Sequence, residues 1–387
     1  MTKIPHTCAK IAANHFPLKQ VVLSLMMAWS LSIHAQGDNS INLQPTSQTD
    51  NDWALLTLSN DYTFTSPSGH SEYIYGAKAF TYVEHSYVLR LEPTNASMTI
   101  TGLPVRFVHI WNPDIRPGSG EDNHPSYILR VLPNSNNVDT VITWKPELNI
   151  EWDTDKFSYE SNYDLAPRVL SLDNRHGQTL ASSAMKVVFE KDVTINEAKR
   201  PARLTEQVAL YMFNSTAQFD QNFTAHLHNI GPELGRGNTT GISLENSSLH
   251  LGGNVDLDLT GQSIFQSSGI YVASNSHLTS SETSQIQINL TNEEETYAGL
   301  FLDGVAVENS TVNLRGDTHI TVKQENIQNE LQNFMYVTYG LKAFSRNAPF
   351  TVQINRLNAD VSSPRATKLA GVYIGGLGTV REARNDQ

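Results

Sequence analysis

The chain has 387 residues, and Asp and Glu outnumber Lys and Arg by 39 to 27, which gives a formal net charge of −12. This acidic composition argues against a nucleic-acid partner, because nucleic-acid binding requires a clustered basic surface. Hydrophobic residues make up 39% of the chain, enough for a large core, so a disordered chain is excluded. The only cysteine is Cys8, which excludes disulfide scaffolds, cysteine zinc sites and thiol catalysis for the rest of the chain.

Residues 1–35 have the pattern of a signal peptide. Residues 21–33 form an apolar segment that is too short to span a membrane, and Ala35 is a small residue at the cleavage position before Gln36. The strong cations of this stretch all precede the apolar segment or lie near its start: Lys3, Lys10 and Lys19. The alternative is a buried helix at the start of a domain. We expect cleavage and export across the inner membrane, which leaves a body of net charge −15 without cysteine.

Residues 36–165 are predicted to form a less regular N-terminal segment. Alternating apolar and polar residues between 76 and 107 predict one early coil of three strands. Residues 111–125 are rich in Pro and Gly, as in a loop, and alternation returns between 127 and 144. We therefore expect 111–165 to be an insertion that projects from the fold as a loop region or a β-hairpin.

A repeat of roughly thirty residues organises 166–387. In one series, pairs of apolar residues flank a polar residue at spacings of 32, 32, 31 and 32, starting from Val193, Ala225, Leu257, Ile288 and Ile320. A second series lies upstream of it, at Met185, Ala217, Leu249, Leu278 and Val312. A third series mostly follows glycine, at Val208, Ile242, Ile270, Leu300, Leu341 and Val372.

Three short strands in each repeat predict one coil of a right-handed parallel β-helix, an all-β solenoid. The alternation points the apolar residues inward and the polar residue between them outward. Coils stacked about 4.8 Å apart would pair each strand with its neighbours above and below. A helical interpretation fails because the apolar period is 2 and not 3.6. We expect Leu257, Ile288 and Ile320 to be stacked in the interior.

Asparagines recur at one place in the repeat, three residues before strands of the second series: Asn214, Asn246, Asn275 and Asn309. Asn tolerates left-handed backbone angles and bonds to its own backbone, so these positions are predicted to be coil corners with stacked side chains. Read singly, such sites also fit the pattern for N-glycosylation. Their recurrence in one structural position favours the corner interpretation.

The signal-like N-terminus and the cysteine-free coils together resemble the passenger region of a pertactin-like autotransporter, a type V secretion protein of Gram-negative bacteria. Asn254–Gly261, Ser268–Ala273 and Lys186–Ile195 are typical of these coils. The resemblance covers 166–380 and, more weakly, 76–110. It implies a monomeric β-helix at the cell surface or outside the cell, acting as an adhesin or virulence-associated protein. The implied partners are host cell-surface or matrix molecules, or bacterial surface partners.

Autotransporter passengers are exported through a C-terminal membrane barrel, and this sequence leaves no room for one after its repeats. The resemblance therefore implies a product that is truncated before the translocator. We expect such a product to reach the cell surface only if a translocator is supplied, and otherwise to stay in the periplasm.

No catalytic residue, metal site or cofactor is expected. The sequence lacks Gly-x-Ser-x-Gly, Gly-Asp-Ser-Gly, His-Glu-x-x-His and a phosphate-binding loop. Asp256 and Asp258 share an outward face, but their equivalents one coil later are Gln287 and Asn289. Carboxylates are thus not stacked across coils, as a calcium-dependent polysaccharide lyase would favour.

One candidate ligand motif is Arg315-Gly316-Asp317, which matches the integrin-binding tripeptide found in some members of this family. The alternative is structural, because Gly316 lies four residues before Ile320, as Gly253 lies four before Leu257. On that interpretation Gly316 is a recurring turn glycine. Two functions therefore stay open: a non-enzymatic adhesin, or a secreted β-helical polysaccharide lyase or hydrolase with a cleft along one flank.

Overall fold

The computed structural model describes residues 56–65, 73–79, 87–111, 125–154, 166–197, 206–229, 237–261, 264–293, 300–325, 336–364 and 366–382. Their regular secondary structure consists of β-strands. No helix long and apolar enough to cross a membrane occurs among them. The predicted signal segment and its cleavage position at Ala35 and Gln36 lie outside the described residues.

The strands pair in parallel with the strands one coil before and one coil after, which forms three sheets. Sheet A holds β1 (Leu56–Leu58), β4 (Tyr87–Leu91), β7 (Pro125–Val131), β10 (Ala166–Asp173), β15 (Glu206–Phe213), β18 (Gly237–Glu245), β21 (Ile264–Ala273), β24 (Leu300–Glu308), and the first parts of β26 (Tyr336–Ser362) and β27 (Lys368–Glu382). Sheet B holds β2 (Tyr62–Phe64), β5 (Ser97–Gly102), β8 (Thr140–Trp144), β13 (Met185–Phe189), β16 (Thr216–Phe219), β19 (Ser248–Leu251), β22 (His277–Ser280), the first part of β25 (Thr311–Gln324), and later parts of β26 and β27. Sheet C holds β3 (Tyr73–Ala79), β6 (Val105–Trp111), β9 (Leu148–Thr154), β14 (Val193–Glu197), β17 (Phe223–Asn229), β20 (Val255–Gly261), β23 (Gln285–Asn292), and the last parts of β25 and β26.

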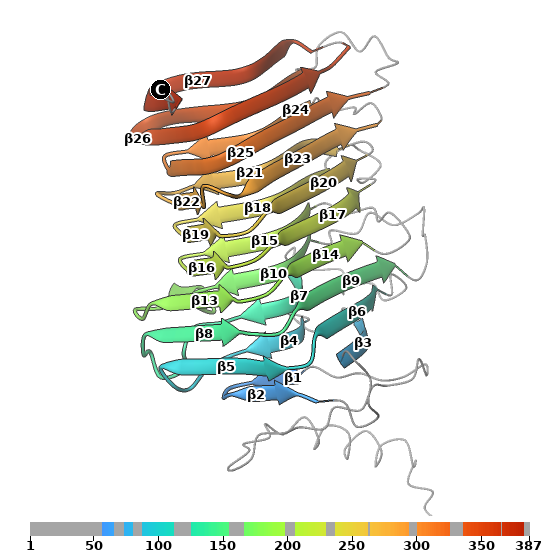
Figure 1. The fold of residues 1–387 in the computed structure, drawn as a ribbon, viewed down its shortest axis with the longest axis vertical. Coiled ribbons are helices and arrows are strands. Elements are labelled where there is room, and N and C mark those ends of the chain that lie inside the picture. The colour runs from blue at the N-terminus through green and yellow to red at the C-terminus, as the bar shows by residue number, and fades with distance from the viewer. Residues whose placement is uncertain are drawn as a thin grey trace, which may run out of the picture. The chain divides into compact units, whose positions relative to one another are not determined.

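Each coil contributes one strand to each sheet in the order A, B, C, and Figure 1 shows successive coils side by side in chain order. Leu257 pairs with Ala225 on one side and Ile288 on the other, and Ile288 pairs with Ile320. Leu257, Ile288 and Ile320 are at most 1% exposed. The predicted all-β parallel β-helix, with these three residues stacked inside, is confirmed.

The prediction that 111–165 projects from the fold is wrong for 125–154. β7, β8 and β9 form a coil of the same helix, each paired in parallel with the coils on both sides. The repeat is longer here, since Ile142 pairs with Val187, 45 residues later, so the 32-residue spacing does not reveal it. Residues 112–124 and 155–165 lie outside the described part of the chain. A small antiparallel hairpin occurs elsewhere, between β11 (Arg175–His176) and β12 (Thr179–Leu180).

An early coil lies between 76 and 107 as predicted, but Gly76–Ala79, expected as the first of its three strands, belongs to the preceding coil. Gly76–Ala79 pairs with Val108–Trp111 in sheet C, and β4 supplies the sheet A strand of the early coil. The helix also extends farther toward the N-terminus than predicted, because β1 at Leu56–Leu58 already pairs in parallel with β4.

The third series of the sequence repeat was out of register at one coil. The series predicts that Leu300 is equivalent to Ile270, whereas Val305 pairs with both Ile270 and Leu341. The reason is that β24 contains an earlier alternating stretch, which includes Leu302 of the core cluster, before the stretch equivalent to Ile270 begins at Val305. Val305 is fully buried in the core cluster.

The recurring glycines of sheet A mark a bend in each strand. Ala209 and its neighbour Leu210 both belong to the interior cluster, so the alternation shifts by one residue at this point. The later coils carry glycine there: Gly241, Gly269, Gly304, Gly340 and Gly371. A Cβ atom on Gly269 would lie 2.3 Å from Ile288 Cγ2 and 2.5 Å from the Gly304 carbonyl oxygen. Glycine fits here because the backbone lies close both to an interior side chain of sheet C and to the backbone of the next coil in sheet A.

The predicted asparagine corners are confirmed. Asn214, Asn246, Asn275 and Asn309 all have positive φ, between 48° and 63°. The Asn246 side-chain amide donates to Asn214 Oδ1 at 2.8 Å, as expected of stacked corners. The next residue along the chain adds a second ladder. The hydroxyl oxygens of Ser247, Ser276 and Ser310 each accept the backbone N–H of the serine one coil earlier, at 3.0 to 3.2 Å.

Candidate functional site

The Arg315-Gly316-Asp317 tripeptide lies inside β25, where the chain passes from sheet B to sheet C. Its backbone is held against the preceding coil, because Arg315 N donates to Ser280 Oγ at 3.0 Å and Asp317 N to the Ser284 carbonyl at 3.1 Å. A Cβ atom on Gly316 would lie 1.8 Å from that carbonyl oxygen. This close approach requires glycine whether or not the tripeptide binds a ligand.

The Asp317 carboxylate already has a partner on the following coil. Arg356 Nη1 donates to Asp317 Oδ2 at 3.2 Å, and the two side chains are 67% and 36% exposed. The Arg315 side chain is exposed. The tripeptide thus lies flat in a coil corner, and its carboxylate is engaged by a neighbouring cation.

Asp256 and Asp258 point outward from sheet C, as predicted. They pair with Gln287 and Asn289 in the next coil, which confirms that their carboxylates are not stacked across coils. Within the described residues, no group of three or more His, Cys, Asp or Glu side chains is arranged to hold a metal ion.

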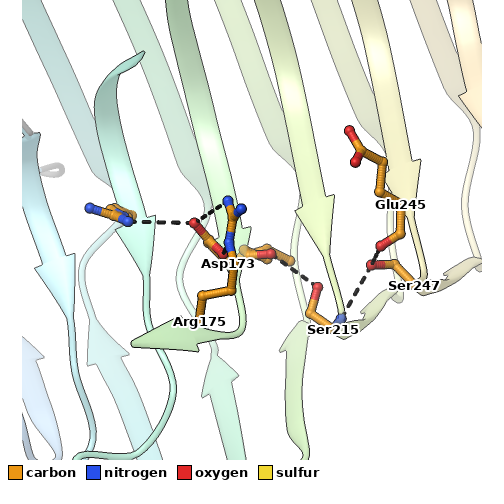
Figure 2. A network of polar contacts seen from close by, with 7 residues as sticks. Asp173, Arg175, Ser215, Glu245 and Ser247 are labelled. Atoms are coloured by element: carbon orange, nitrogen blue, oxygen red, sulfur yellow. Dashed lines mark hydrogen bonds and ion pairs between the residues drawn. The ribbon is translucent and has the colours of Figure 1, made fainter. Parts of the chain in front are cut away.

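Sequence reasoning missed a cluster of charged residues on the outer side of sheet A. Asp173, at the end of β10, accepts hydrogen bonds from Arg175 Nε at 2.6 Å and Arg175 Nη2 at 2.9 Å. Figure 2 shows Asp173 beside Arg175. Arg130 Nη2 reaches the same carboxylate at 3.4 Å from the preceding coil. The Asp173 side chain is 2% exposed, so this carboxylate is buried between two guanidinium groups. Buried charges are stable only when paired in this way.

Aromatic rings lie beneath the arginines of this cluster. The guanidinium carbon of Arg130 lies 4.4 Å from the ring centre of Tyr127, and that of Arg168 lies 3.8 Å from the ring centre of Tyr211. Arg175 covers the ring of Phe213 at 4.1 Å. Such cation–π contacts fix the orientation of each guanidinium group. We call Arg130, Arg168, Asp173 and Arg175 the arginine cluster.

Two groups at the cluster, Tyr211 and Arg175, have pKa values that the surroundings raise. Burial raises the pKa of Tyr211 to about 12, although the nearby Arg168 opposes the shift. The hydrogen bond to Asp173 raises the pKa of Arg175 and outweighs the opposing effect of burial. The phenol is therefore neutral and able to donate a hydrogen bond near neutral pH, and the guanidinium is charged.

A second polar group lies on the same side of sheet A, farther along the helix. The sheet register places Asp303 in one row with Arg168, through Val208, Thr240 and Ser268. Lys342 Nζ donates to Asp303 Oδ2 at 3.0 Å, and the Asp303 side chain is 1% exposed. On the next two coils, the rings of Tyr339 and Tyr373 stack with centres 4.8 Å apart.

We expect the Asp303 carboxyl to make stability depend on pH. Burial raises its pKa, and Lys342 opposes this shift without cancelling it. Because the folded pKa of Asp303 is higher than the unperturbed value of 3.8, the native state binds the carboxyl proton more tightly than the unfolded chain does. Stability from this group is full below that pH and is lost as pH rises through the folded pKa. Urea unfolding at increasing pH should show wild type losing stability relative to Asp303→Asn.

The control for this experiment is Asp256→Asn, which removes a half-exposed carboxylate and the same formal charge. A stability difference between wild type and Asp303→Asn that stays constant with pH would contradict the expectation.

The apolar repeat of the sequence does not reveal the arginine cluster, because its members lie at outward positions, where the repeat does not require apolar residues. Arg130 and Asp173 are 43 residues apart and meet only through the stacking of two coils of unequal length.

The chain was compared with protein-family models, with curated proteins and with solved structures, and none of the three comparisons found a match.

Proposed function

We propose that this chain is an exported passenger of the autotransporter type, exposed at the cell surface or secreted, which acts as a non-enzymatic adhesin. The observation that carries the proposal is the uninterrupted stack of coils, from Leu56 to Glu382, in which each coil pairs with its neighbours. Such a chain can fold one coil at a time as it emerges from a pore, and it needs no disulfide to do so. The signal-like sequence of 1–35 and the absence of cysteine after Cys8 support export.

Binding in this proposal takes place on the outer sides of the stacked coils. Residues 125–154 are part of the helix, so they do not supply a separate binding hairpin. The outward side chains form rows that cross the coils, and such rows offer a long, repetitive surface to host cell-surface or matrix molecules.

The test is binding of purified 36–387 to cultured cells and to immobilised matrix, with the variant Asp317→Ala beside wild type. We expect both to bind equally, because Asp317 forms only a partly exposed ion pair. Its loss should cost about 1 kcal/mol of stability or less. Loss of most binding in Asp317→Ala, with the fold intact, would make the tripeptide the ligand. Failure of wild type to bind any cell or matrix surface would contradict the adhesin proposal.

A secreted β-helical polysaccharide lyase or hydrolase is the second candidate, and one observation favours it. Asp303 and Lys342 lie within hydrogen-bond distance on the same side of sheet A as the arginine cluster. A buried carboxyl with a raised pKa beside a cation is a common arrangement in acid–base catalysis. Release of unsaturated or reducing sugars from a polysaccharide panel, and its loss in Asp303→Asn, would favour this function over the adhesin.

A further inference from the structure

We propose that the free edge of β27 pairs with the same edge of a second copy of this chain, as two antiparallel strands related by a two-fold axis at Tyr373. β27 pairs in parallel with β26, and none of the strands that the structure describes lies on its other side (Figure 1). Such pairing differs from the monomer that the family resemblance implies. It does not depend on what the outer sides of the coils bind.

The interior side chains of β27 lie uncovered. Three apolar residues occupy the positions that face the interior in this strand of sheet A: Leu369, Val372 and Ile374. Their partners in β26 are buried, because β27 lies against them, whereas these three side chains are 44% to 50% exposed. A further strand laid along this edge would remove that apolar surface from water, which stabilises the pairing.

The edge of β27 lacks the features that commonly keep exposed strands apart. Charged side chains and prolines block many such edges in natural sheets. From Leu369 to Val380 the sequence has neither a charged residue nor a proline. Alternate residues of a strand direct their backbone N–H and C=O groups away from the neighbour already paired. This edge can therefore accept another strand, although the protein as a whole has a net charge of −12.

The sequence around Tyr373 makes the edge complementary to itself. Residues 371–375 read Gly-Val-Tyr-Ile-Gly, so residues of similar size lie at equal distances on both sides of Tyr373. Two antiparallel copies centred there would place Val372 of each opposite Ile374 of the other, and interior side chains would meet interior side chains. A two-fold interface requires a surface that matches itself in this way, which favours a second copy over an unrelated partner.

A stack of tyrosine rings on the outer side of sheet A would continue across the two-fold axis. The rings of Tyr339 and Tyr373 have centres 4.8 Å apart and planes inclined by 12°. Residues directly opposite in antiparallel strands have Cβ atoms about 4.5–5.5 Å apart. The two copies of Tyr373 would therefore lie within stacking distance, which adds an aromatic pair to the apolar contacts.

The opposite end of the described helix offers no comparable apolar surface. Leu58, Tyr62 and Phe64 of the first described coil are at most 4% exposed. Head-to-tail stacking of copies into fibres is therefore disfavoured. Pairing of two β27 edges uses the same surface on both copies, so it closes after one dimer.

Sedimentation equilibrium of purified 36–387 measures the oligomeric state. We expect a reversible dimer at chain concentrations up to about 100 μM, and no larger species. Ile374→Lys should weaken the dimer roughly tenfold or more, because each copy would bring a charge into an apolar contact. The Ile374 side chain is 50% exposed in the single copy, so the variant should keep its fold, which circular dichroism would verify.

The matched control is Leu180→Lys, which adds the same charge at a leucine of β12 that is 55% exposed. This variant should form the dimer as wild type does. A monomer at every concentration, growth into larger species, or a dimer that Ile374→Lys leaves unchanged would overturn the inference.

A cross-link tests the register of the pairing. Residues 36–387 contain no cysteine, so Tyr373→Cys introduces a single thiol in each copy. Oxidation with copper phenanthroline should join two copies by a disulfide, because opposite residues of paired strands lie close enough to form one. Leu180→Cys should cross-link far less under the same conditions. A dimer without the cross-link at position 373 would also overturn the inference, because the two copies would then meet elsewhere.

Discussion

Leu257→Asp should prevent the helix from folding or lower its free energy of unfolding by roughly 4 kcal/mol or more. Leu257 is fully buried, and its neighbours in the stack are Ala225 and Ile288. An aspartate there would place a charge in an apolar interior, with only hydrocarbon above and below it. The register of β20 cannot shift to expose it, because a shift by one residue would turn Val255 and Leu259 outward as well.

The matched control is His319→Asp, an outward position in the same sheet, where the new carboxylate would lie between Gln287 and Asn358. Its stability should stay within about 0.5 kcal/mol of wild type. Urea unfolding followed by circular dichroism measures both variants. A folded Leu257→Asp protein with a midpoint close to that of wild type would show that Leu257 is not in the interior.

Gly269→Ala should lower stability by roughly 1–3 kcal/mol although it adds a single methyl group. The new Cβ would lie 2.5 Å from the Gly304 carbonyl oxygen and 2.3 Å from Ile288 Cγ2. Moving Ile288 would relieve only one of the two contacts, because the other is to the backbone of the next coil. The strand would therefore have to move away from its neighbour, and pairing of sheet A would weaken at this point.

The same glycine column provides the control in its last described member. At Gly371 the nearest atom to an added Cβ would be Ala359 Cβ, at 3.8 Å, which is an ordinary contact. Gly371→Ala should therefore leave stability unchanged or raise it by about 0.4–1 kcal/mol, because alanine restricts the unfolded chain. Thermal unfolding of the two variants side by side measures the difference. Equal effects of the two substitutions would contradict the explanation by close approach.

The fold could be predicted from the sequence where the repeat length is regular. Leu257, Ile288 and Ile320 are 31 and 32 residues apart and lie directly on one another. In the first coils the turns differ in length, so that Ile142 and Val187 are stacked although 45 residues separate them. Alternation was visible at 127–144, but without a constant spacing it did not reveal the partner strand. The physical limit is that turns tolerate insertions and strands do not.

The arginine cluster on sheet A could not be predicted from the sequence, for a different reason. An interior position is apolar in most coils, so it leaves a periodic trace, whereas an outward position varies freely. Arg168 and Tyr211 are stacked against each other 43 residues apart, and neither has an equivalent residue in the neighbouring coils. The tripeptide at Arg315–Asp317 was conspicuous as a motif, but its position against Ser284 could not be foreseen without the register of β25.

The serine ladder at the asparagine corners bears on how proteins of this kind change during evolution. The same hydrogen bond recurs from coil to coil: the backbone N–H groups of Ser215, Ser247 and Ser276 each donate to a serine hydroxyl oxygen of the next coil. The contact surface between one coil and the next is therefore repeated. Duplication of a DNA segment that encodes one coil would insert a unit with matching surfaces on both sides. Loss of such a segment would rejoin two coils that already fit each other. Gene length can therefore vary by whole coils, while outward residues such as Arg168 diverge independently in each copy.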